Sequence, residues 1–151
     1  MERLKKFLRR KKVQEAKLIE RREEGRVKSQ LEELCGGDDE LYRALRWINL
    51  DPRGKDPKEY EMKAKEEEKQ GKLLHARVNY HVAGSLYLYA GNARSAVKCF
   101  SKCSELHKKL YGENSIHEAY EYLKKREGAE KAIPILKTYL ELIVKEEKKK
   151  E

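Results

Sequence analysis

Residues 60–103 read YEMKAKEEEKQGKLLHARVNYHVAGSLYLYAGNARSAVKCFSKC, and this stretch contains one pattern twice. Each copy has an aromatic residue, a small residue, a glycine and then Ala-x-x-x-aromatic-x-x-small. The first copy is Tyr60, Ala64, Gly71, Ala76, Tyr80 and Ala83, and the second is Tyr80, Gly84, Gly91, Ala96, Phe100 and Cys103. Small residues where helix backbones touch, and rings where gaps remain, are typical of stacked helical hairpins.

Residues 57–106 resemble tetratricopeptide-repeat proteins, whose motif places these residue types at fixed offsets over two antiparallel helices. Two features depart from that family: Gly71 and Gly91 are 20 residues apart instead of ~34, and Lys108 stands where proline ends a repeat. The resemblance predicts an all-α fold of antiparallel helical hairpins, stacked as a short tetratricopeptide-like array. A small helical bundle such as the trafficking-associated three-helix domain, which has a similar Gly-x-x-x-x-Ala pattern, is the alternative.

The rest of the chain divides into helices at its glycines, prolines and capping residues. A long basic N-terminal helix is expected at residues 2–34, so the predicted units are residues 1–35 and a helical domain of residues 36–151. A linker is expected near 51–57, before a repeat-like core at 57–144. The helices expected in that domain cover residues 39–50, 57–70, 72–90, 93–110 and 115–125, and after Gly128 a last helix ends near residue 144.

Local signals predict where these helices begin. The expected caps are Asp38 or Asp39, Asp56 followed by Pro57, and Ser115 with Glu118. Pro134 is expected in the first turn of the last helix, because a proline in a helix interior costs roughly 3 kcal/mol. Residues 145–151 are expected to be a frayed, solvated tail.

The helix expected at 72–90 is apolar on two faces, which predicts that it packs between neighbouring helices. One face is Leu73, Ala76, Tyr80, Ala83 and Tyr87, and the other is Leu74, Val78, Val82 and Tyr89. The two copies of the pattern converge on Tyr80 and Ala83, which should therefore be nearly inaccessible. The next helix should point its own apolar face inward, with Ala96, Phe100, Cys103, Leu106 and Leu110.

Composition predicts a soluble protein of a reducing cytoplasm. Charged residues make up 42% of the 151-residue chain, and the bias toward Lys, Arg and Glu over Asn and Gln resembles a thermophile's protein. Three cysteines without a secretory leader argue against a disulfide framework. The longest uncharged run, Val78 to Ala93, is too short and too polar to span a bilayer.

The net charge of +9 is concentrated at the N-terminus, where residues 1–28 hold twelve basic and five acidic side chains. Such a dense basic block favours contact with RNA or DNA, because each neutralised phosphate releases a counterion. The predicted nucleic-acid contacts are Arg3, Lys5, Lys6, Arg9, Arg10, Lys11 and Lys12. A solvated or protein-docked terminus is the second interpretation, and a helix lying on an anionic membrane is the third.

The family resemblance implies ligand-facing positions on the helix expected at 72–90, namely Val78, His81, Ser85, Leu88 and Tyr89. The Lys, Asn and Arg residues of the family's carboxylate clamp are missing there, so recognition of an acidic peptide C-terminus is not expected. The alternative is that these five residues pack against the helices expected at 2–34 or 39–50.

No cofactor, metal or catalytic site is predicted. Cys99, Cys103 and His107 follow one another at four-residue spacing. The third side chain then lies about 12 Å from the first along a helix, so the two cannot bind the same metal ion. The glycine turns lack the Lys-Ser/Thr of phosphate-binding loops. His81 lies in an almost uncharged helix, where it is either a base with a shifted pKa or a hydrogen-bonded core residue.

These features predict a non-enzymatic helical adaptor or accessory subunit of a protein or nucleoprotein complex. It would bind a protein partner through the helical stack and place its basic N-terminal helix against RNA or DNA. A direct nucleic-acid-binding protein is the alternative, and a membrane-surface trafficking adaptor is a lesser one.

Overall fold

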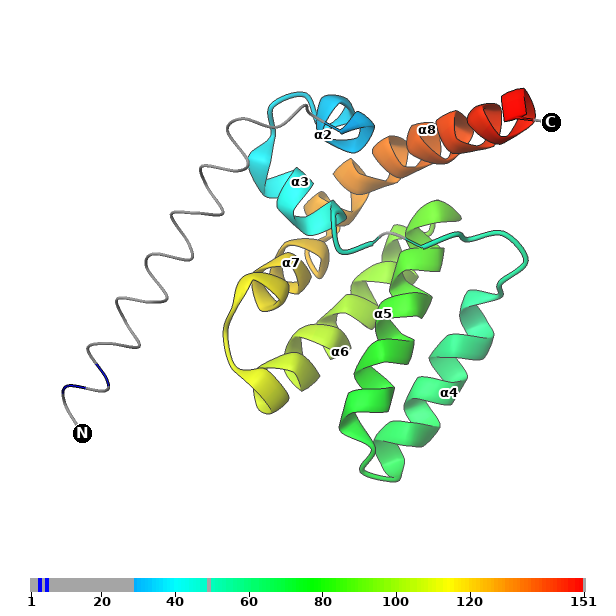
Figure 1. The fold of residues 1–151 in the computed structure, drawn as a ribbon. Helices are drawn as coiled ribbons and strands as arrows, with labels where there is room; N and C mark the ends of the chain where they lie inside the picture. Colours follow the sequence, from blue (N-terminus) through cyan, green and yellow to red (C-terminus); the bar gives the residue numbers. More distant parts are fainter. Residues whose placement is uncertain (1–2, 4, 6–28, 49, 151) are drawn as a thin grey trace.

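The computed structural model describes residues 3, 5, 29–48 and 50–150, which contain seven helices of three or more residues and no strand. The helices are α2 (Gln30–Leu34), α3 (Asp39–Leu45), α4 (Pro57–Lys69), α5 (Leu73–Tyr89), α6 (Ala93–Tyr111), α7 (Ser115–Leu123) and α8 (Arg126–Lys150). The all-α prediction is confirmed. Successive helices α4, α5 and α6 run side by side, and α3, α7 and α8 lie together on the remaining side of α5 and α6 (Figure 1).

The central hairpins begin and end where the local signals predict. Asp56 caps α4 through a hydrogen bond to the Lys58 amide, and Pro57 occupies its first turn. The turns between the three helices contain Gly71 and Gly91, whose φ angles of 76° and 80° are unfavourable for residues with a Cβ. These two glycines therefore fix the lengths of α4 and α5.

The predicted helix at 2–34 is not continuous. Ser29 is extended, with φ −69° and ψ 162°, and its side chain accepts a hydrogen bond from the Glu32 amide, so a separate short helix starts at Gln30. Residues 2, 4 and 6–28 of that prediction lie outside the described residues. The helix predicted at 39–50 also ends early, at Leu45, because a turn follows in which the Ile48 amide bonds the Leu45 carbonyl.

Three predictions about the C-terminal helices are wrong. The cap of α7 is Asn114 rather than Ser115, and its side-chain oxygen accepts from the amides of Ile116 and His117. α8 begins at Arg126, so Gly128 lies inside it instead of before it, and Pro134 lies in its interior. A Cβ at Gly128 would collide with the Tyr122 carbonyl oxygen, so this glycine serves close packing rather than helix termination.

Residues 145–150 are solvated as predicted but helical rather than frayed. Near its end α8 carries Glu147, which accepts two hydrogen bonds from the Arg53 guanidinium at 2.7 and 2.8 Å. Glu146 accepts one from the Gln30 side chain at 3.0 Å. These exposed contacts join the end of α8 to α2 and to the segment before α4, although exposed ion pairs stabilise a fold only slightly.

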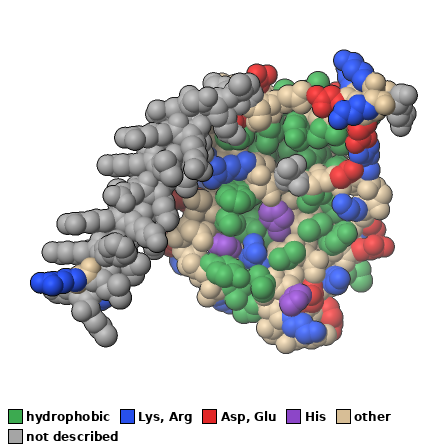
Figure 2. Space-filling view, in the orientation of Figure 1, with side chains coloured by type: hydrophobic (Ala, Val, Ile, Leu, Met, Phe, Trp, Pro, Cys, Tyr) green, Lys and Arg blue, Asp and Glu red, His purple; other side chains and the backbone are tan. Residues whose placement is uncertain are grey.

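Helix α5 is the centre of the core. Ala83 is fully buried and Tyr80 is 2% exposed, as predicted. Gly84 lets α6 approach closely, because a Cβ there would lie 3.0 Å from the Phe100 ring. Burial of both faces holds only for the second half of α5: Leu74 and Val78 are 42% and 45% exposed, and Figure 2 shows hydrophobic side chains on the surface over this helix. Leu110, predicted to point inward, is also exposed.

A line of hydrogen bonds joins α3, α5 and α7 beside this core. The Trp47 carbonyl can only accept, so the Nε2 atom of His81, 3.0 Å away, carries a proton and donates it. In the neutral imidazole Nδ1 must then accept, and it does so from the Tyr120 hydroxyl at 2.8 Å. The Tyr120 oxygen in turn accepts from Nη1 of Arg77 at 2.9 Å. His81 is thus a hydrogen-bonded core residue.

We expect Ala83→Arg to prevent folding, because the new charge would be buried without a partner in the middle of α5. The free energy of unfolding should fall by more than about 4 kcal/mol, measured by denaturant unfolding. His75→Arg is the matched control, since His75 is exposed on the same helix. A cooperative Ala83→Arg variant that melts close to the wild type would contradict the position of α5.

Burial lowers the pKa of His81 from 6.5 to about 4, so the folded state favours the neutral ring. The contribution of His81 to the free energy of unfolding is complete above pH 6.5 and is lost as the pH falls to 4. The reason is that over this interval His81 binds a proton in the unfolded chain but not in the folded one. The free energy of unfolding should drop by about 3 kcal/mol across this interval. Urea titrations at several pH values should show a shallower drop for His81→Gln and an unchanged one for His75→Gln. Equal drops for wild type and His81→Gln would refute the assignment.

Candidate functional site: a groove between α4 and α6

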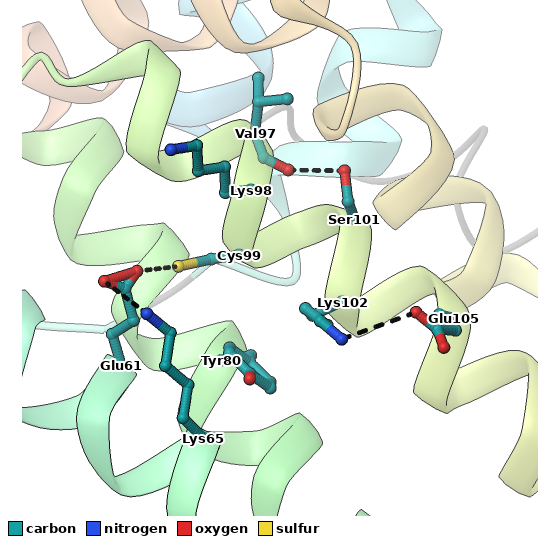
Figure 3. A pocket seen from close by; sticks show the side chains of 9 residues that line it. All are labelled: Glu61, Lys65, Tyr80, Val97, Lys98, Cys99, Ser101, Lys102 and Glu105. Carbon is teal, nitrogen blue, oxygen red and sulfur yellow. Dashed lines mark hydrogen bonds and ion pairs between the residues drawn. The ribbon is translucent and has the colours of Figure 1, made fainter. Parts of the chain in front are cut away.

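An open groove of about 420 Å³ lies between α4 and α6, above the side of α5 that carries Tyr80. Its walls and floor come from all three helices (Figure 3). The lining residues are Glu61 and Lys65 of α4, Tyr80 of α5, and Val97, Lys98, Cys99, Ser101, Lys102 and Glu105 of α6. The short turns at Gly71 and Gly91 hold the three helices in this arrangement.

The floor of the groove is made of groups that are neutral at physiological pH. Burial, and then the hydrogen bond to Glu68 at 2.8 Å, raise the pKa of the Tyr80 hydroxyl well above its ordinary value. Burial, and then the nearby Glu61 carboxylate, raise the pKa of the Cys99 thiol to about 12. A thiol with that pKa is a poor nucleophile, since the thiolate is the reactive form. The floor is therefore suited to contact rather than to covalent chemistry.

The rim of the groove is charged, and most of its charges are already paired. Lys102 Nζ lies 3.1 Å from a Glu68 carboxylate oxygen and 4.0 Å from Glu105, and Lys65 lies 4.0 Å from Glu61. Lys98 is exposed and forms no ion pair with any described residue. The lysines of this rim can donate hydrogen bonds to carbonyls or carboxylates of a bound segment, while the floor contacts the side chains of that segment.

The five predicted partner-binding positions lie elsewhere on α5 and are largely occupied by the chain itself. Ser85 and Leu88 are fully buried, and the His81 imidazole is used by Trp47 and Tyr120. The Tyr89 hydroxyl approaches the Ile48 carbonyl at 3.5 Å. The contacts of His81 and Tyr89 agree with the alternative in which these residues pack against the segment at 39–50. Val78 alone of the five is strongly exposed.

The residues weighed for metal binding do not converge. The Cys99 thiol faces Glu61 at 3.6 Å, the Cys103 thiol faces the Arg77 carbonyl at 3.7 Å, and His107 bonds Asn114 at 2.9 Å. Within the described part of the chain no group of three His, Cys, Asp or Glu side chains could hold a metal ion. Of the predicted nucleic-acid contacts, Arg3 and Lys5 are exposed, and the other five lie outside the described residues.

A buried cluster between α6 and α7 contains the residue types of a hydrolase triad. The Ser104 hydroxyl lies 3.2 Å from Nε2 of His117 and donates to Glu121 at 3.0 Å. Glu121 also lies 3.2 Å from the same Nε2 atom. In a triad the carboxylate holds the other ring nitrogen and leaves Nε2 to the serine. This cluster therefore ties α7 to α6, and its arrangement is not that of a catalytic triad.

The groove residues were not predicted, although the sequence contains a signal for them. On α6, Val97, Ser101 and Glu105 follow one another at four-residue spacing, and so do Lys98 and Lys102. This stripe lies beside the buried face of Ala96, Phe100 and Cys103, and helical spacing alone places it on one surface. What the sequence does not indicate is that α4 stands opposite it.

No described helix has the length and apolar character needed to cross a membrane. In comparisons with protein-family models, with curated proteins and with solved structures, nothing matched this chain.

Proposed function

We propose that this protein is a non-enzymatic helical adaptor or accessory subunit that holds a segment of a partner protein in the groove between α4 and α6. The observation that carries the proposal is the groove itself, whose 420 Å³ falls in the range of about 300–1,000 Å³ typical of ligand sites. It is open, and its walls are regular helices rather than loops.

The chemistry of the lining supports a polypeptide as the occupant. A peptide offers side chains for a neutral floor such as Val97, Cys99 and Tyr80, and it offers backbone carbonyls for the lysines of the rim. Because Lys65 and Lys102 are already paired with glutamates, a highly charged ligand would have to displace those pairs. A segment of mixed polarity fits better than a polyanion.

The charge of residues 1–28 supports a second candidate function, direct binding of RNA or DNA. These residues carry twelve of the 36 basic side chains but only five of the 27 acidic ones. In an adaptor, the same segment would attach the partner to a nucleoprotein complex. The two functions differ in whether the partner stays bound once nucleic acid is removed.

Ser101→Trp should fill the groove and reduce the amount of partner protein that co-purifies with the tagged full chain from its native cells by at least tenfold. Ser101 is exposed on α6, so the substitution should leave the fold intact. Met62→Trp is the control, because Met62 is 70% exposed on α4 and does not line the groove. Partner recovery should survive nuclease treatment. Equal recovery with Ser101→Trp and wild type would exclude the groove as the binding site.

Replacing Lys5, Lys6, Arg9, Arg10, Lys11 and Lys12 with Gln should weaken binding to generic RNA and duplex DNA and remove most of its salt dependence. The reason is that fewer counterions are released when fewer phosphates are neutralised. Affinity would be measured by fluorescence anisotropy at two salt concentrations. Replacing Lys145, Lys148, Lys149 and Lys150 with Gln removes charge from the other end of the chain and serves as the control. The idea fails if the two variants bind equally well.

A further inference from the structure

The side of α5 opposite the groove exposes apolar side chains around Arg77, and the Arg46 guanidinium lies 5.0 Å from the centre of the nearby Trp47 ring. Six large hydrophobic residues are exposed in the described part of the chain. Five of them lie on α5, at the end of α6 or in the turn after α3: Trp47, Leu74, Val78, Leu110 and Tyr111. We call these five residues and Arg77 the Arg77 surface. In Figure 2, basic and histidine side chains lie among hydrophobic ones on the visible face of the molecule.

Contacts relate the parts of the chain that carry these residues. Leu74 and Val78 lie within one turn of Arg77 on the same helix, and the Arg77 guanidinium lies 5.9 Å from the centre of the Tyr111 ring on α6. On the other side, the Trp47 carbonyl is bonded to His81, one turn beyond Arg77. The surface therefore spans the N-terminal half of α5, the end of α6 and the turn after α3.

Arg77 lacks a counter-charge among the described residues. Its Nη1 atom donates to Tyr120, and its Nε atom is buried without a hydrogen-bond partner among them, so a ligand would have to reach the guanidinium from its Nη side. No carboxylate of the described residues forms an ion pair with it, and α5 contains no acidic residue. Glu113, close to Tyr111 in sequence, is paired with Lys108 at 3.3 Å. A partly buried cation without a counter-charge is costly, which favours a ligand that supplies one.

We propose that the Arg77 surface binds an acidic amphipathic segment of a partner protein, with a carboxylate on Arg77 and aliphatic or aromatic side chains on the five hydrophobic residues. A carboxylate can bond the guanidinium through two parallel hydrogen bonds, and it adds specificity as well as affinity. Leu74 and Val78 lie one turn apart on α5, and an amphipathic helix binds by laying its own apolar face against exposed apolar side chains of this kind. This surface is separate from the groove, so it adds a second partner-binding site to the proposed function.

Other occupants fit this surface less well. A basic segment would meet Arg77 with a like charge. A nucleic acid could offer a phosphate to the guanidinium, but its backbone would leave the five hydrophobic side chains without contacts. An acidic segment with apolar residues satisfies both features of the surface at once.

The test starts with random 12-residue peptides displayed on phage and selected on the full chain. Selected peptides should combine at least one Asp or Glu with two or more large apolar residues. A labelled synthetic copy of the best peptide should bind Val78→Asp at least tenfold more weakly than wild type, by fluorescence anisotropy. Its affinity for Ser101→Trp, which alters the groove, should not change. This second variant makes failure of the inference distinguishable from failure of the groove proposal.

Arg77→Gln should also weaken the peptide at least tenfold, and Arg77→Lys should restore part of the affinity. Because Arg77 also bonds Tyr120, Val78→Asp remains the decisive variant if Arg77→Gln fails to fold. Selected peptides without acidic residues, or equal binding to Val78→Asp and wild type, would overturn the inference. Failure to select any peptide would overturn it too. Sedimentation velocity would then measure the oligomeric state. A dimer would indicate that a second copy of the chain covers the surface, and a monomer would leave residues 1–28 of the same chain as the candidate occupant.

Discussion

The hydrogen bond between the His81 ring and the Trp47 carbonyl ties the turn after α3 to the middle of α5. Its direction is fixed, because a carbonyl cannot donate, and it therefore also fixes the direction of the bonds to Tyr120 and Arg77. The same turn meets the end of α5, where the Tyr89 hydroxyl approaches the Ile48 carbonyl. In the second half of α5, Ser85 and Leu88 are fully buried. In the first half of α5 one side is buried, with Ala76 and Tyr80, while Leu74 and Val78 stay exposed on the other. His81 thus lies where the exposed side of the helix ends.

The helical boundaries of the centre could be predicted because the signals that set them are local. Asp56 with Pro57, Gly71 and Gly91 act on the backbone within a few residues, and α4, α5 and α6 begin and end beside them. Where tertiary contacts decide, prediction failed. Pro134 is tolerated inside α8, a helix of 25 residues whose buried side includes Ala132 and Leu136. Propensity alone placed that proline in a first turn.

The contrast between local signals and tertiary contacts also explains which parts of the candidate sites could be predicted. The family resemblance implied that Val78, Ser85 and Leu88 face a ligand, but it could not show that Ser85 and Leu88 are buried or that the turn after α3 contacts this helix. That outcome depends on a backbone carbonyl, which has no signature in the sequence. The groove depends on the spacing between α4 and α6, two helices that are not neighbours in sequence. Its residues on α6 were visible as a stripe, while their relation to Glu61 and Lys65 emerged only from the fold.

The groove and the Arg77 surface differ in whether their cations are already paired with carboxylates. In the groove, Lys65 and Lys102 are paired with glutamates, so binding there exchanges one set of ion pairs for another and gains little from charge. If a partner segment binds in the groove as proposed, its selectivity would come mainly from the shape of the neutral floor. Arg77 has no such carboxylate among the described residues, and a partner that brings one removes a cost that the free protein bears. Charge would then determine which partner binds the Arg77 surface, and shape would determine which segment enters the groove. Because α5 contributes to both, its rigid core position would hold two different partners at a fixed distance from each other.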